Sequence, residues 1–510
     1  MPSTIDNLPN ELLVKIFVLY RSPRGSHLET FGAATKPDRK NVGTLPLLMS
    51  VCRRWHAVIL EAPLLWQAID IGKSTQWLDL ALARSRDVVP ELYFHSYPTS
   101  VEALPMLMPL LHRVRTLWLP PMPPSDLLLL SSAQAPGFPV LEELGLWVNT
   151  PMRQYRSNCV PFDLSSTRLP ALRVLLLQCA VVSWNAEVMS KLRFLHLHSC
   201  TPAEKEPSFA HLLDVLEGCH ELEVLELHRV IARFEPPSPR DPPRTIRLPK
   251  LRELTLDDEP KFVRDLIIHV YVPETVEVHL KGSITDPLDD HILGILTGGF
   301  HSLLPINLSN IPVVRMIRDI WINLTDDEEQ QIIGAIPLRS SAPLKLTLYS
   351  PHELDWEHYQ AKLLCDFASR LKDVPLEGLR FTSGWWDPLH HKAWADLFRL
   401  LPTLRRLEVD TGGYTDVLLG LSGSSSDNTP LLPDLRSLKL HNIKGSFHQH
   451  IHLIAALRKR AQFGLPKLDY IGLEYLDGGA TALQEAMARE GVTLGDLSSY
   501  VTKFECWPST

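Results

Sequence analysis

One short leucine pattern recurs along this chain and constrains its fold more than any other feature. It consists of an apolar residue, two variable residues, a leucine, one variable residue and a second leucine or a similar apolar residue. The ten copies begin at Val114, Leu141, Leu172, Leu192, Leu222, Leu251, Leu376, Leu404, Leu435 and Leu468. Within the two runs, successive copies start 20 to 33 residues apart. One unit of this length cannot bury its apolar edge alone, so neighbouring units are expected to stack and share a core.

Prolines mark the start of many of these units. The prolines that lie two residues before the start of a copy are Pro139, Pro170, Pro249, Pro402, Pro433 and Pro466. Proline ends a helix and favours extended backbone before it, so it fixes the entry into a strand. The pattern and its spacing resemble the leucine-rich repeat. We therefore expect an α/β fold in which residues 73–510 form a leucine-rich-repeat-like solenoid, with a curved parallel sheet and helices outside. Scattered buried strands of another α/β fold are the alternative.

The middle of the chain keeps only weak copies of the pattern. Between residues 258 and 350 these copies begin at Val276, Ile317 and Leu344, and we expect irregular units to continue the array there. Two segments, the proline-rich 235–245 and the serine-rich 421–430, have the composition of exposed loops.

Side chains alternate between the two faces of a strand, so the same pattern predicts which residues point away from the core. Leu144 and Leu146 should point inward. The outward residues should be apolar in the early strands (Trp118, Trp147, Val174, Leu176, Phe194) and then mostly polar or charged (His196, His198, Glu226, His228, Glu253, Asp257, Arg380, Arg406, Glu408, Asp410, Lys439, His441, Glu474). An exposed apolar patch usually marks an interface. The hypothesis is that a target protein binds Trp118, Trp147, Phe194, His196, His198, Glu226 and His228, unless inserted loops cover them.

The first 70 residues carry a different apolar pattern, one typical of helices. Residues 8–20 carry apolar side chains at three- and four-residue steps, with Pro9 and Glu11 in the first turn, which predicts an amphipathic helix. A second helix is predicted over 45–62, halted by Pro63, and an apolar segment, 64–66, follows it. A helical module this small cannot bury all of its apolar side chains, so some of them are expected to bind a partner.

Three blocks of this module, Leu8-Pro9-x-Glu11-Leu12-Leu13-x-x-Ile16-Phe17, Val51-Cys52-Arg53-Arg54-Trp55 and Pro63-Leu64-Leu65-Trp66, resemble the F-box motif as fungal proteins carry it. The resemblance implies an F-box domain over residues 1–72 that binds a Skp-type adaptor and, through it, a cullin–RING ubiquitin ligase. By position, the adaptor-binding residues would be Leu8, Pro9, Leu12, Ile16, Val51 and Trp55, although the same residues could instead form the module's own core. Residues 21–44 depart from the family pattern and have the composition of an inserted loop.

The net charge and the cysteine content limit which compartment the protein is expected to occupy and which partners it is expected to bind. The net charge of −8 disfavours a nucleic-acid surface. Seven cysteines without a C-x-x-C pair favour a reducing compartment over a disulfide framework. The N-terminus has no signal-peptide pattern, and no apolar run is long enough to span a bilayer. We expect a cytoplasmic or nuclear protein that binds no membrane.

Signals of catalysis or cofactor binding are weak. Gly72-Lys73-Ser74 lacks the earlier glycine of a phosphate-binding loop, since position 67 is Gln67. Two groups, His196/His198/Cys200 and His448/His450/His452, could bind a metal, but surface or interface histidines are the simpler interpretation. The expectation is a non-catalytic ubiquitin-ligase subunit without cofactor or metal. A scaffold that binds the adaptor without delivering a target, and an enzyme built on repeats, are the alternatives.

Overall fold

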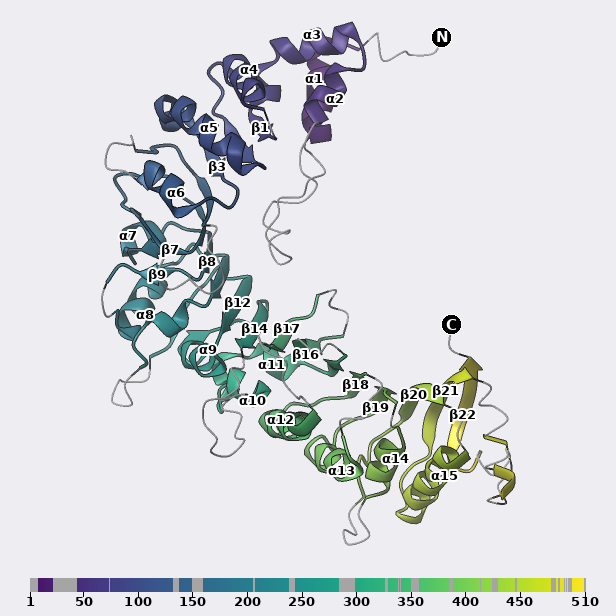
Figure 1. Cartoon of the computed structure of the whole chain (residues 1–510). Coiled ribbons are helices and arrows are strands. Elements are labelled where there is room, and N and C mark those ends of the chain that lie inside the picture. The colour runs from purple at the N-terminus through teal and green to yellow at the C-terminus, as the bar shows by residue number, and fades with distance from the viewer. Residues whose placement is uncertain are drawn as a thin grey trace. The chain divides into compact units, whose positions relative to one another are not determined.

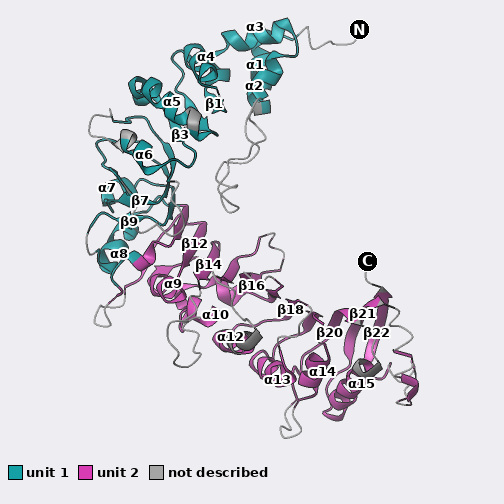
Figure 2. Cartoon of the chain, in the orientation of Figure 1, with its two compact units in different colours: residues 1–222, 233–235 teal, residues 223–232, 236–510 magenta. Residues whose placement is uncertain are grey.

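The computed structural model describes residues 8–21, 44–72, 74–131, 137–148, 159–204, 207–237, 244–283, 299–325, 329–337, 339, 341–349, 357–384, 389–412, 414–423, 430–444, 447–477, 483–484, 487–489, 491, 493 and 498–508. These residues belong to two compact units (Figure 2), residues 1–222 with 233–235, and residues 223–232 with 236–510. Most of the predicted inserted loop, and the centres of the two predicted exposed loops, lie outside the described residues. Within the described part of the chain, no helix has the length and apolarity needed to cross a membrane.

The first unit begins with the small helical module (Figure 1), formed by α1 (Asn10–Arg21), α2 (Thr44–Met49), α3 (Arg53–Glu61) and the 3-10 helix η4 (Pro63–Trp66). The predicted single helix over 45–62 is therefore wrong: it is two helices. Cys52 has extended backbone, and its sulfur accepts the backbone N–H of Trp55, so it caps a new helix instead of continuing the old one. The indole of Trp66 donates to the carbonyl of Ile59 at 2.8 Å, which ties η4 to α3.

A parallel sheet forms the rest of the first unit. Its strands follow in the order β1 (Ala68–Ile71), β2 (Glu91–Phe94), β3 (Thr116–Trp118), β4 (Glu143–Trp147), β6 (Val174–Gln178) and β8 (Phe194–His198). Between successive strands the chain forms α4 (Thr75–Ser85), α5 (Tyr97–Leu107), η5 (Met108–Arg113), α6 (Pro124–Ser131) and α7 (Ala186–Met189), and α8 (Phe209–Glu217) follows β8. A second small parallel sheet contains β5 (Val160–Phe162), β7 (Ala180–Val182) and β9 (Thr201–Pro202). The first two strands of the main sheet precede every copy of the leucine pattern.

The second unit also contains a predominantly parallel sheet. Its first strands are β10 (Val224–His228), β12 (Glu253–Asp258) and β14 (Glu277–Ser283), and its last are β18 (Gly378–Ser383), β19 (Arg406–Asp410), β20 (Ser437–Lys444), β21 (Leu468–Asp477) and β22 (Val501–Pro508). The helices α12 (Glu357–Arg370), α13 (His391–Leu400), α14 (Tyr414–Ser422) and α15 (Phe447–Gln462) pack one against the next beside these strands (Figure 1). Farther up the chain, α9 (Pro260–Ile267) packs on β12 and β14.

The leucine pattern forms the core of both units. All three apolar positions of all ten copies are buried, and equivalent positions pair in register, as Leu117 does with Leu144 and Leu144 with Leu175. The predicted inward direction of Leu144 and Leu146 is confirmed. Because the apolar rows of neighbouring strands stack, each strand buries its edge against the next, which is how a unit too small to fold alone is stabilised.

The middle of the second unit breaks the parallel order. Here β15 (Asp319–Leu324), β16 (Glu329–Ala335) and β17 (Leu344–Tyr349) form antiparallel pairs, and β17 lies beside β14 while β15 lies beside β18. The sheet therefore runs β14, β17, β16, β15, β18. The three weak copies of the pattern fall on β14, β15 and β17, but the antiparallel strand β16 among them carries no copy.

Candidate functional site

The helical module exposes an apolar face. Leu12 and Ile16 of α1 are both 43% exposed, and Val51, in the break between α2 and α3, is 57% exposed. Leu47 and Leu64 are more exposed still. Isolated exposed apolar residues are ordinary, but these five lie within one small module, on α1, α2, η4 and the break after α2, and a partner docked on the module would cover them.

The module's own core uses the other side of the same helices. Leu13 and Phe17 of α1 are fully buried, together with Ile59 and Trp66. Leu12 and Ile16 each precede one of these buried residues by one position, so α1 has two apolar faces, one internal and one facing solvent. The interpretation that the predicted adaptor-binding residues serve only as core is therefore wrong for Leu12, Ile16 and Val51.

The other predicted adaptor-binding residues, Leu8, Pro9 and Trp55, differ in exposure. Pro9 is exposed, and Leu8 is half-buried while its carbonyl oxygen accepts a hydrogen bond from the Arg54 guanidinium. The half-buried Trp55 packs its ring on Phe17, with ring centroids 4.7 Å apart, so Trp55 contributes to the core as well as to the surface.

The aromatic patch expected on the early strands is not exposed. Trp118 and Trp147 are 4% and 9% exposed, and Val174, Leu176 and Phe194 are buried as well. The two indole rings pack on each other, with centroids 5.4 Å apart, across Gly145. A Cβ at position 145 would lie 2.7 Å from the Trp118 ring, so the missing side chain is what lets both rings lie flat on the strand. The prediction of an exposed apolar patch at these positions is wrong.

The histidines that follow on β8 are more accessible. His196 and His198 are half-buried, whereas Cys200 is buried and donates its S–H to the carbonyl of Leu177 at 3.4 Å. His198 and Cys200 belong to no cluster of metal-capable ligands among the described residues. In the other group considered from the sequence, His450 is buried with its ring against Tyr475, and the side chain of His448 lies outside the described part of the structure.

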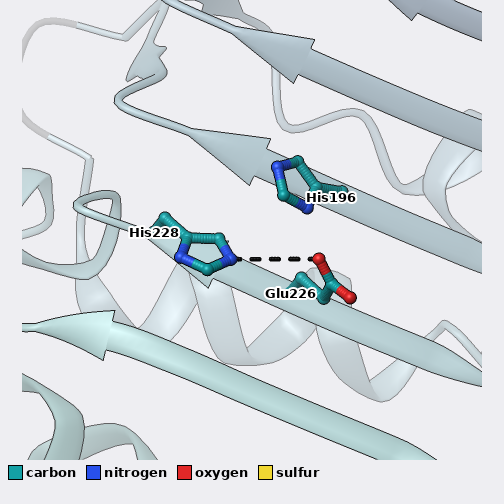
Figure 3. A group of neighbouring side chains, drawn as sticks. All are labelled: His196, Glu226 and His228. Atoms are coloured by element: carbon teal, nitrogen blue, oxygen red, sulfur yellow. Dashed lines mark ion pairs between the residues drawn. The ribbon is translucent and has the colours of Figure 1, made fainter. Parts of the chain in front are cut away.

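In the second unit, hydrogen bonds join polar side chains of three strands. His228 Nδ1 lies 3.1 Å from Asp257 Oδ2, and the hydroxyl of Tyr349 donates to Asp257 Oδ1 at 2.9 Å. His228 Nε2 and the buried carboxylate of Glu226 lie 3.9 Å apart (Figure 3). Burial alone would lower the pKa of His228, but its hydrogen bonds to Asp257 and Glu226 raise it above its usual value. The two acids therefore favour the protonated form of His228.

A second network crosses the late strands. The half-exposed Trp321 of β15 lies under the guanidinium of Arg380, which is 5.1 Å from the ring centroid. Arg380 Nε lies 3.5 Å from Glu408, and His441 bridges Glu408 and Glu474. The hydrogen bond from His441 lowers the pKa of Glu408, and Glu408 raises the pKa of His441 in return.

This outward face was predicted in part. The sequence predicted Arg380, Glu408, His441 and Glu474 as outward residues, and the structure joins them into one network. Trp321 was missed, although its place between the buried Ile320 and Ile322 gives the alternation that would have identified it. Trp and Arg are the residue types most often found at the energetic centres of protein interfaces.

Comparison with known families finds a match for one part of the chain, its N-terminal module. Residues 5–72 match the family model for F-box-like domains, which agrees with the resemblance carried by the three sequence blocks. F-box domains generally bind Skp1-type adaptors. A search of curated proteins finds no match to this chain.

Proposed function

We propose that this chain is the substrate-recognition subunit of a Skp–cullin–F-box type E3 ubiquitin ligase. In this proposal the F-box binds the adaptor through Leu8, Pro9, Leu12, Ile16, Val51 and Trp55. The remaining sheet acts as a leucine-rich-repeat-like surface for a target protein. The chain contributes proximity and orientation to ubiquitin transfer and no catalytic group of its own.

The observation that carries the proposal is the exposed apolar face of the F-box helices. A module with a complete core has no internal use for Leu12, Ile16 and Val51 in solvent. Docking on an adaptor would remove this apolar surface from water, which is the main favourable contribution in most protein associations.

Target capture is assigned to the outward side of the sheet. The exposed pair Trp321 and Arg380 supplies an aromatic ring and a guanidinium on neighbouring strands, and ion pairs continue from it to Glu408. The buried ring pair Trp118 and Trp147 contributes to folding in this view, and the half-buried His196, His198 and His228 stay in the proposed target-binding set.

Two experiments test the proposal. Replacing Leu12 and Val51 together by lysine should abolish co-purification with a Skp-type adaptor while the chain remains folded, and undiminished co-purification would refute the F-box assignment. Cells lacking the chain should then accumulate a protein that the tagged chain captures when the proteasome is blocked. If captured proteins keep the same half-life without the chain, it is a scaffold and not a receptor.

A further inference from the structure

The last strand of the second unit, β22, continues the apolar core but is incompletely covered. Val501, Phe504 and Cys506 have the spacing of the leucine pattern, and they lie in register with the three apolar positions of the tenth copy on β21. In the ten earlier copies all three positions are buried. In β22 only Val501 is buried, whereas Phe504 is half-buried and Cys506 is exposed. The apolar rows of this core therefore end at β22 with part of their surface still in solvent.

The backbone of β22 also has an open side. Among the described strands of the second unit, β22 pairs with β21 alone, and it forms the end of that sheet (Figure 1). A strand directs its backbone N–H and C=O groups alternately to its two sides, so an edge strand presents a row of such groups to another strand. With eight residues, β22 is long enough to form several of these hydrogen bonds.

Two opposite charges on β22 restrict which strand could pair there. Lys503 and Glu505 flank Phe504 and share the outward side of the strand, with Lys503 Nζ 2.6 Å from Glu505 Oε1. Their side chains are 63% and 43% exposed. Charges on an edge strand usually oppose pairing with other strands. A strand that carries a base and an acid in the same positions, and runs the opposite way, would instead place an acid opposite Lys503 and a base opposite Glu505.

We infer that β22 pairs antiparallel with β22 of a second copy of this chain, across a two-fold axis at Phe504. An axis perpendicular to the sheet keeps the outward side of both copies outward, so facing residues share a side. An axis at Lys503 or at Glu505 would set like charges directly opposite each other, which is destabilising. With the axis at Phe504, Lys503 of each copy faces Glu505 of the other, and the two Phe504 side chains meet on the core side.

The molar mass of the full chain in solution tests the pairing, measured by light scattering after size exclusion over a series of concentrations. The mass of the wild-type chain should rise from that of a monomer toward that of a dimer. Lys503→Glu sets acid against acid at two places, so it should raise the dissociation constant of the dimer about tenfold. Lys503→Glu combined with Glu505→Lys restores two opposite pairs and should restore the dimer. The matched control is Lys392→Glu, at an exposed lysine of α13, which should leave the mass unchanged.

A single added cysteine tests the register of the two strands. With the axis at Phe504, Thr502 of one copy faces Cys506 of the other, and both positions are exposed. Facing residues of an antiparallel pair lie within the reach of a disulfide, so Thr502→Cys treated with oxidised glutathione should give a covalent dimer on a non-reducing gel. The control, Thr502→Cys combined with Cys506→Ser, should give none.

Three results would overturn the inference: a chain that stays monomeric up to its solubility limit, a dimer that Lys503→Glu leaves unchanged, or equal covalent dimer from Thr502→Cys and its control. A charge-exchanged chain that dimerises no better than Lys503→Glu would also overturn it. The proposed function is tested separately, because adaptor co-purification depends on the F-box helices and should be the same for the wild-type chain and Lys503→Glu.

Discussion

Replacing Leu12 by lysine should detach the chain from its adaptor and leave the fold intact. Leu12 is 43% exposed, so docking would hide somewhat less than half of its surface. Full burial of a leucine side chain is worth about 1.5–3 kcal/mol, and the exposed share therefore contributes about 1 kcal/mol to adaptor binding. A lysine would lose this contribution and place an unpaired charge in the interface, which costs at least about 2 kcal/mol more. The sum, about 3 kcal/mol, weakens binding on the order of 100-fold.

The fold should tolerate the same change. Lysine is a good helix former, and its apolar stem can cover the surface that Leu12 covers while the ammonium stays in water. We expect the free energy of unfolding to change by less than about 1 kcal/mol. The matched control is Leu13→Ala, one residue away and fully buried, which should cost about 2–5 kcal/mol of stability and leave the exposed face in place.

Adaptor affinity by surface plasmon resonance and unfolding by urea, measured on the same three proteins, separate the two roles. The reasoning is refuted if Leu12→Lys binds the adaptor as tightly as the wild-type chain, or if Leu12→Lys and Leu13→Ala destabilise the fold equally.

Three further predictions test the packing and the polar contacts of the two units. Gly145→Ala should cost about 1–3 kcal/mol in urea unfolding, because its Cβ would press on two buried indole rings. Gly378→Ala should cost less than about 1 kcal/mol, because its Cβ meets a carboxylate that can swing away. Equal losses would contradict the packing argument. Burial lowers the pKa of His228, but Asp257 raises it by more, so protonated His228 stabilises the fold. This stabilisation is complete below the unfolded pKa of about 6.5 and is lost as pH rises through the folded pKa. The difference in unfolding free energy between wild type and His228→Gln should therefore shrink from pH 6 to pH 9, and a constant difference would rule this out. Arg460→Met should cost about 2–4 kcal/mol by thermal unfolding, because the buried guanidinium donates to three loop carbonyls, and an unchanged midpoint would show that water replaces it.

The sequence predicts the core well because burial is periodic. A leucine at every second position of a strand can be read from the chain alone, and all the positions predicted in this way are buried. The exposure of Leu12 and Ile16 could be predicted only from the F-box resemblance, because an amphipathic pattern does not distinguish a core from a docking face.

The sequence predictions that proved wrong did so for local physical reasons. Trp118 and Trp147 occupy outward positions, and alternation says where a side chain starts but not whether a large ring then lies over a glycine. The break at Cys52 falls inside a continuous apolar pattern, so periodicity could not reveal it. Strand β16 pairs antiparallel with both neighbours, and its sequence, EQQIIGA, lacks the leucine spacing that marks most of the parallel strands.

The antiparallel strands in the middle of the second unit suggest how this sheet could be shortened by a deletion. Strands β14, β17 and β18 all point the same way, and β15 and β16 stand between the last two as an added pair. Excising residues 319–335 would leave β17 and β18 codirectional, with α12 as an ordinary crossover between them. A shortened chain that refolds in this manner would lose Trp321 and keep Arg380, so the contribution of the aromatic ring could be measured apart from that of the guanidinium.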